Sequence, residues 1–319
     1  MRGVHGAVGA VFRVLLAFTA FAMGGTPVAS AADVGAASGQ VGTLRFERHG
    51  DHGRPVILIP GLECGPWVWE QTIADLQKDH VVYAVTLAGF DGVPPPAHDA
   101  GAGTLLDRAD ASLLQLIERE HIDRPVLVGH SIGGTLSLRF AGEHAKLLSG
   151  VVAVDGLPVF PGMDRARAAQ RQAIAERMKA RLAAMTPAQF QAAALSYMQH
   201  VGVIDPSLAM REAPLVARSD AKATADYMAA DMAADYRPVL KQADVPILEI
   251  SPYNAPDFAA AAMGKQPATS EMQKTAYYQS LLANAPEAKV VSISPSRHFA
   301  MLDQPAKFRR TLAGFLDSL

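Results

Sequence analysis

The chain is short of cysteine and of net charge, and both shortages narrow what it can be. Its 319 residues include a single cysteine, Cys64, so no disulfide can form within the chain and stability must come from packing. Lys plus Arg number 29 against 31 Asp plus Glu, which gives a net charge of -2 and no electrostatic bias toward nucleic acid. Half of the residues are hydrophobic, which is enough to bury a full core.

Motifs for metals and dinucleotides are also missing. The sequence contains no cysteine pair, no His-x-x-x-His spacing, and no Gly-x-Gly-x-x-Gly after a strand-like run. We therefore predict neither a resident metal nor a cofactor. The expected partner is a small-molecule substrate.

The first 31 residues differ in composition from the rest. Basic residues flank an apolar segment over 14–23, and the small residues 29–32 follow it. These are the three parts of a secretory signal peptide, and the apolar segment is shorter than the ~20 residues that span a bilayer. We expect cleavage after Ala31 or Ala32, export to the periplasm or the medium, and no stable membrane insertion of the mature protein.

Short apolar runs alternate with longer helix-like segments along the mature chain. The runs are rich in Val and Ile and are bounded by Gly, Pro, Asp or Asn, which favours buried strands of a parallel sheet with helices on both faces. The predicted strands are 43–48, 55–60, 80–86, 125–129, 150–154, 246–251 and 289–294. The predicted helices are 66–78, 104–121, 133–147, 271–284 and 304–318.

The segment 157–240 breaks this alternation, because it is rich in Ala, Met, Gln and Arg and has no strand-like run. We predict an all-helical insertion there, within a core formed by 32–156 and 241–319. Thr186 and Asp205, each followed by Pro, indicate two helix starts. We expect the insertion to be a lid that shapes a substrate pocket, and the alternative is a bundle that only stabilises. The lid hypothesis depends on an excess of methionines, namely Met163, Met178, Met185, Met198, Met210, Met228 and Met232.

An apolar run enters the pentapeptide Gly129-His-Ser-Ile-Gly133, and a helix-like segment leaves it. Glycines at both ends allow a sharp strand-to-helix turn that exposes the hydroxyl of Ser131. The first amides of a helix are unpaired, so the N–H of Ile132 can donate to an oxyanion on a substrate attacked by Ser131. We predict that Ser131 is a nucleophile.

A serine hydroxyl needs a base, which is usually a histidine oriented by a carboxylate. Of the ten histidines, His298 is favoured because it follows the last predicted strand, on a loop at the same sheet edge as Ser131. His130, inside the pentapeptide, is expected to pack beside the nucleophile and to border the substrate.

The loop after the strand 55–60 is the expected source of a second oxyanion donor. Gly61 lets the backbone approach the substrate closely, and the N–H of Leu62 is the predicted donor. Trp67, farther along the loop, is expected either to pack in the core or to line the substrate pocket, and we keep it as a candidate substrate-binding residue.

These motifs together resemble the α/β-hydrolase superfamily over nearly all of the mature chain. The matching segments are Pro60-Gly-Leu62, the pentapeptide 129–133 and the histidine loop from Arg297 to Pro305. The resemblance implies the α/β-hydrolase fold, a mostly parallel doubly wound sheet with a helical lid. It also implies a Ser-His-acid triad, usually acting on esters and sometimes on amides, thioesters or epoxides. Pro60 stands where many relatives have His, which is tolerable because the backbone amide does the work.

The acid of the triad has two candidate positions. The superfamily's usual place follows the strand 246–251, but here the Gly-x-x-Asp pattern is missing and Asp257 is displaced. The other known place is the end of the strand after the elbow helix, where Asp155 is followed by Gly. We prefer Asp155 and keep Asp257 as the alternative.

The expected function is therefore a serine esterase that cleaves a carboxylic ester of a largely apolar small molecule through an acyl-enzyme. Two alternatives stay open. One is an amide or peptide hydrolase such as an exported aminopeptidase, in which Glu63 would hold a substrate amine. The other is a catalytically inactive ligand-binding protein, because the fold alone does not prove hydrolysis.

Overall fold

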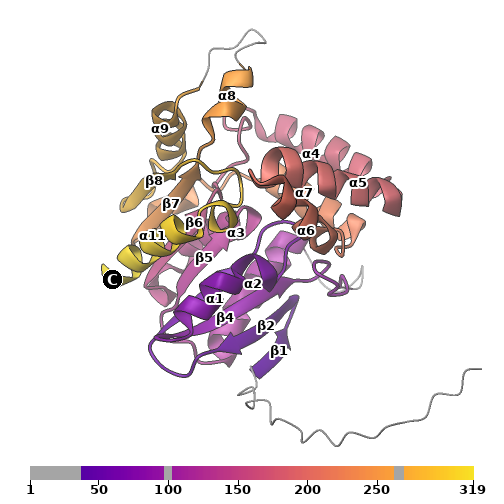
Figure 1. Ribbon diagram of the computed structural model, residues 1–319. Coiled ribbons are helices and arrows are strands. Elements are labelled where there is room, and N and C mark those ends of the chain that lie inside the picture. The colour runs from indigo at the N-terminus through magenta and orange to yellow at the C-terminus, as the bar shows by residue number, and fades with distance from the viewer. Residues whose placement is uncertain (1–36, 97–102, 262–268) are drawn as a thin grey trace, which may run out of the picture. The chain divides into compact units, whose positions relative to one another are not determined.

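One eight-stranded sheet organises the chain in the computed structural model, which describes residues 37–96, 103–261 and 269–319 (Figure 1). The strand order is β1-β2-β4-β3-β5-β6-β7-β8, and all pairs from β4 onward are parallel. The predicted signal peptide lies outside the described residues. The strands are β1 (Ala37–Val41), β2 (Leu44–His49), β3 (Arg54–Ile59), β4 (His80–Leu87), β5 (Val126–His130), β6 (Gly150–Val154), β7 (Ile247–Pro252) and β8 (Ala288–Ile293).

The strand β1 is not predicted from the sequence, and the composition of this strand explains why. Its residues, ASGQV, are mostly small or polar and mostly exposed, so they form no apolar run. The strand lies at the edge of the sheet and pairs only with β2, antiparallel. Pairing with β2, rather than an intrinsic strand preference, accounts for this element.

Helices cover both faces of the sheet, as the alternation predicts. The helices α2 (Leu105–Arg119) and α3 (Ile132–His144) pack into one core cluster through residues such as Leu113 and Phe140. The helices α1 (Glu70–Leu76) and α11 (Pro305–Asp317) cover the opposite face, where Trp69 and Phe308 are buried. The α/β doubly wound fold is therefore confirmed.

The chain between β6 and β7 forms four α-helices beyond the carboxyl ends of the parallel strands (Figure 1). An isolated bridge between Val159 and Asp235 joins the start and the end of this segment. Thr186 accepts a hydrogen bond from the N–H of Gln189, and Asp205 accepts one from Ser207, so both predicted caps are confirmed. The helices are α4 (Ala168–Ala183), α5 (Pro187–Tyr197), α6 (Pro206–Val216) and α7 (Ala221–Ala233).

None of the helices in the described ranges combines the length and the apolar character needed to cross a bilayer.

Candidate active site

Ser131 occupies the turn between β5 and α3 in a backbone conformation that side chains rarely adopt. Its φ is 53° and its ψ is -122°, and its N–H donates to the carbonyl of Val154 at 2.9 Å. Only glycine fits at positions 129 and 133. A Cβ at 129 would lie 2.1 Å from the carbonyl oxygen of Gly133, and a Cβ at 133 would lie 2.5 Å from the carbonyl oxygen of Ile59. The pentapeptide thus builds a strained turn with a serine at its apex.

The loop after β3 passes directly beside this serine. A Cβ at Gly61 would lie 3.2 Å from the Cβ of Ser131 and 2.6 Å from Nδ1 of His130, so only glycine lets the loop come this close. The N–H of Cys64 donates to the carbonyl of Gly61 at 3.1 Å and closes the turn. Leu62, on this loop, lines the same cavity as Ser131 and Ile132.

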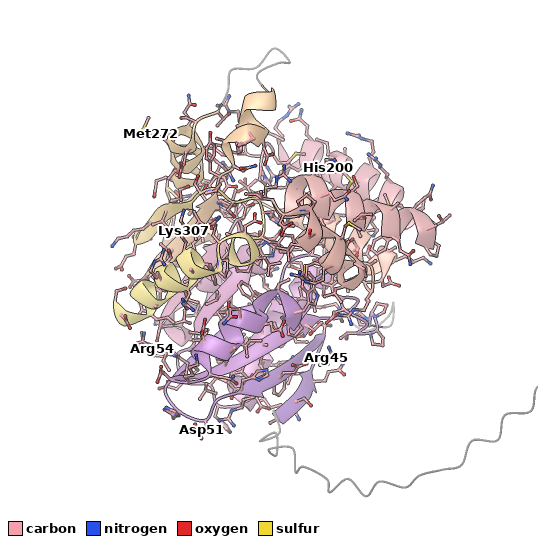
Figure 2. The ribbon with its side chains drawn as sticks, viewed as in Figure 1. Arg45, Asp51, Arg54, His200, Met272 and Lys307 are labelled. Carbon is pink, nitrogen blue, oxygen red and sulfur yellow. The ribbon has the colours of Figure 1, made fainter. Side chains whose placement is uncertain are left out.

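His298 lies on the loop after β8 and also borders that cavity. Its Nδ1 lies 2.5 Å from Oδ2 of Asp155. Because a carboxylate can only accept, Nδ1 is the donor in this contact, and in the neutral ring Nε2 is then the nitrogen with a free lone pair. The backbone N–H of His298 donates to the carbonyl of Val201, which belongs to the helical insertion. His200, in contrast, is exposed on the insertion, away from the sheet (Figure 2).

Asp155 follows β6 with a φ of 51° and has three hydrogen-donating or cationic neighbours. Besides His298, Tyr278 donates its hydroxyl to Oδ1, and Nζ of Lys274 lies 3.7 Å from the same oxygen. Burial acts to raise the pKa of this carboxyl. The charge of Lys274 and the hydrogen bonds from His298 and Tyr278 outweigh burial and hold the pKa well below its usual range, so Asp155 is ionised.

Asp257, the alternative acid, is engaged elsewhere. It lies on the short helix α8 (Ala255–Ala261) and forms a two-point ion pair with Arg297, at 2.7 and 2.8 Å. Arg297 in turn donates to the carbonyls of Gln199 and Val203. The structure thus brings Asp155, and not Asp257, to the histidine.

His130 is fully buried between the nucleophile turn and the histidine loop. Its Nε2 donates to the backbone carbonyl of His298 at 3.1 Å. Burial, with a smaller contribution from the charge of His298, lowers the pKa of His130 well below its ordinary value, so the ring is neutral. His130 therefore supports the histidine loop through this hydrogen bond, and it also borders the cavity.

Trp67 lies behind the cavity wall. Its ring stacks on that of Phe299, with centroids 6.5 Å apart, and Phe299 itself borders the cavity. Trp67 is not among the residues that line the cavity. Its core packing, which the sequence left open as the alternative, is what the structure shows, so its direct role in substrate binding is corrected to support of Phe299.

A cavity of about 470 Å³ connects these groups. One side is the sheet edge that carries Ser131, Asp155 and His298, and the other is formed by the helical insertion. Of the seven methionines that suggested a lid, Met185 and Met228 line the cavity. The insertion contributes an apolar wall that includes Phe160, Leu182, Met185, Phe190 and Met228.

Tyr278 and Lys274 are the functional candidates that sequence reasoning missed. Both lie on α9 (Glu271–Leu281), a helix that was predicted from its pattern. Their spacing of four residues places them on one face of that helix. No local signal shows that this face is turned toward Asp155, which lies more than a hundred residues earlier in the chain.

Comparisons with known proteins show what the chain is similar to. At 28% identity over 147 residues, the chain resembles 1-acylglycerol-3-phosphate O-acyltransferase ABHD5 of Rattus norvegicus, matching 46% of this chain and 41% of the relative. It also matches the putative carbamate hydrolase RutD of Yersinia enterocolitica, at 30% identity over 35% of this chain and 39% of the relative. The chain thus spans less than half the length of these curated relatives.

Solved structures extend the likeness to most of the chain. An enol-lactonase from Burkholderia xenovorans superposes with a TM-score of 0.67 at 18% identity, covering 88% of this chain and all of its own. An esterase from Exiguobacterium antarcticum gives 0.66 at 16% identity, covering 86% and 95%. At these identities the likeness concerns the fold. Residues 56–311 match the sequence profile described as the alpha/beta hydrolase family, and the chain belongs to that family.

Proposed function

We propose that the protein is a serine hydrolase that cleaves a carboxylic ester of a largely apolar small molecule. The observation that carries this proposal is the contact of His298 with the ionised Asp155, at 2.5 Å, on the same cavity as the strained Ser131 turn. A histidine oriented in this way can act as a general base toward a serine hydroxyl.

In the proposed cycle, Nε2 of His298 takes the hydroxyl proton of Ser131 as Oγ attacks the ester carbonyl. The amides of Leu62 and Ile132 stabilise the oxyanion, and each such donor typically contributes ~3 kcal/mol to lowering the barrier. The protonated His298 then gives its proton to the departing alcohol, which leaves an acyl group on Ser131. Water, deprotonated by the same histidine, hydrolyses the acyl-enzyme and restores the free serine.

Asp155 has an orienting role in this scheme. It holds Nδ1 protonated, so that Nε2 stays available, and its charge stabilises the imidazolium that forms during each attack. Lys274 and Tyr278 keep Asp155 ionised and fixed. Asp257 acts apart from the chemistry, through its pair with Arg297.

The cavity supports an apolar substrate part. Its insertion wall is aliphatic and aromatic, and a cavity of about 470 Å³ suits a small molecule rather than a polymer. No lysine or arginine appears among the described residues that line it. This disfavours acyl transfer to a phosphate-bearing acceptor, the reaction in the name of the rat relative. We accordingly propose that the segment 157–240 is a lid that sets substrate preference.

Two other functions use the same site. Amide or peptide hydrolysis needs the same nucleophile, base and oxyanion donors, and Glu63, which also lines the cavity, is the group that would hold a substrate amine. A catalytically inactive ligand-binding protein would keep the cavity without turnover.

Labelling with a fluorophosphonate probe, followed by peptide mass spectrometry, tests the proposal. We expect one adduct, on Ser131, which disappears in Ser131→Ala and in His298→Ala and is unchanged in Ser280→Ala, an exposed serine outside the cavity. Panels of ester and amide substrates then separate esterase from amidase. A folded protein that takes no label supports the inactive binding protein and contradicts the hydrolase.

A further inference from the structure

The cavity contains more carboxyl groups than the proposed chemistry uses. Asp155, Glu63 and Asp231 all line it. Asp155 has a histidine, a tyrosine and a lysine as partners. Glu63 and Asp231 have no lysine, arginine or histidine within ion-pair distance among the described residues, so when they ionise their charge has no local compensation.

Glu63 directly follows the predicted oxyanion donor Leu62, and its backbone adopts a φ of 63°. Burial raises the pKa of its carboxyl to about 7, and the facing hydroxyl of Thr224 only partly opposes this rise. The positive φ is uncommon for a residue with a side chain. The turn that brings Leu62 to Ser131 therefore also places this carboxyl beside the reaction centre.

Asp231 lies on the opposite, insertion side. It follows Thr224 and Met228 on α7, and the spacing of four and three residues puts all three on the face of that helix that lines the cavity. Burial raises the pKa of Asp231 to about 7, and the nearby hydroxyl of Thr135, one turn beyond Ser131, opposes the rise. The two carboxyls thus reach the cavity from two different elements.

Thr224, whose hydroxyl faces the Glu63 carboxyl, adds a second observation about the hydrogen bonding of this cavity. Its side chain is 1% exposed, lines the cavity, and carries a hydroxyl oxygen with no hydrogen-bond partner of normal geometry among the described residues. Buried hydroxyls in folded proteins are normally paired, so this one points to a polar group that binds there.

We propose that Glu63, Thr224 and Asp231 form a subsite for a positively charged ammonium group of the substrate. This proposal deepens the proposed ester hydrolysis and rests on it, because the ligand is a substrate only if the protein is a hydrolase. An ammonium donates up to three hydrogen bonds, which suits the Glu63 carboxylate with the Thr224 hydroxyl that faces it, and Asp231, two helical turns farther along α7, adds a second negative charge to the same cavity. Tyr197 and Phe160 also line the cavity, and the faces of aromatic rings attract cations. The apolar wall then takes the rest of the molecule.

A structural role explains these carboxyls less well. Elsewhere on α7, Asp226 shows what a structural carboxylate looks like in this protein, because it pairs with Lys179 at 2.6 Å outside the catalytic cavity. Above pH 7, where both carboxyls are ionised, they repel an anionic ligand, and a neutral alcohol leaves their two charges uncompensated. An ammonium compensates both charges.

The test measures binding without turnover. Isothermal titration calorimetry at pH 8 on Ser131→Ala compares three ligands with the same eight-carbon chain: octylamine, octan-1-ol and octanoate. We expect octylamine to bind about tenfold or more tightly than octan-1-ol, and octanoate to bind most weakly. The alkyl chain is common to all three, so the difference reports the polar end alone.

Substitutions then locate the preference. Glu63→Gln and Asp231→Asn, each in the Ser131→Ala background, are expected to remove most of the advantage of octylamine while leaving octan-1-ol within about twofold. Asp226→Asn, on the same helix, is the matched control and should keep the advantage. Thermal unfolding of each variant verifies that it is folded.

The outcomes separate the two proposals. Equal binding of octylamine and octan-1-ol, or an advantage that survives in both carboxyl variants, would overturn the ammonium subsite whether or not Ser131 takes the fluorophosphonate label. A clear octylamine advantage in a protein that takes no label would uphold the subsite as a ligand site and overturn the hydrolase.

Discussion

The sheet edge and the helical insertion build the two sides of one cavity by different means. At the sheet edge, backbone positions are fixed by strained turns at Ser131 and Asp155 and by glycines with no space for a side chain. The insertion consists of Ala-rich helices that leave large apolar side chains such as Met210 exposed. This difference fits the proposal that the sheet edge fixes the chemistry and that the insertion sets which substrates it acts on.

The largest expected effect separates the two aspartates that the sequence could not rank by geometry. Asp155→Asn should lower kcat by about 10⁴-fold, because the imidazole loses its correct tautomer. Asp257→Asn should stay within a few-fold of wild type, since its partner is Arg297. Steady-state kinetics with a chromogenic ester measures both. The reverse ranking would show that another arrangement of the histidine loop operates during turnover.

A smaller effect is expected on the insertion side. Met185→Trp narrows the apolar wall, so kcat/KM for a long-chain 4-nitrophenyl ester should fall about tenfold while that for the acetyl ester changes little. Met210→Trp is the control, because Met210 is 65% exposed on α6. Equal loss with both chain lengths would mean that the wall supports the fold and does not read the substrate.

The smallest expected effect concerns stability. The pKa of Asp231 is raised from 3.8 to about 7 in the folded protein, so the folded state keeps a proton that the unfolded state has already lost. Stability is therefore lowered progressively as pH rises from about 4 to 7. The Tm of Asp231→Asn minus the Tm of wild type should therefore be about 5 °C larger at pH 8 than at pH 4.

Differential scanning calorimetry at the two pH values measures this change. Asp226→Asn, which removes an ion-paired carboxylate, should show no such gain. If Asp231→Asn follows wild type at both pH values, the carboxyl is solvated and the burial argument fails.

The sequence predicted the elements that have a recognisable local residue pattern. Apolar runs predicted β2 to β8, and the glycines around Ser131 predicted a turn whose crowding the structure makes plain. The edge strand β1 escaped because its residues have no apolar alternation and depend on β2 for their shape. Local patterns thus predicted the other strands of the sheet but not the edge strand β1, whose conformation depends on pairing with β2.

Contacts across the chain were beyond sequence reasoning. Asp155 and Asp257 both follow strands at the same edge, and nothing local shows that Arg297 takes one while His298 takes the other. Trp67 shows the same difficulty, since its ring packs on Phe299, more than two hundred residues later. Charge compensation is likewise a property of the folded cavity, so Asp231 on an Ala-rich helix gave no signal.

The histidine loop has a consequence for redesign of this protein. The N–H groups of His298 and Phe299 donate to the carbonyls of Val201 and Gly202, in the π-helical turn Met198–Gly202 of the insertion. The insertion therefore cannot be exchanged independently of the active site, because its backbone carbonyls help to position the proposed base, His298. A chimera that replaces this segment to obtain a new specificity must reproduce those two carbonyls, or it will exchange the pocket and misalign the histidine in one step.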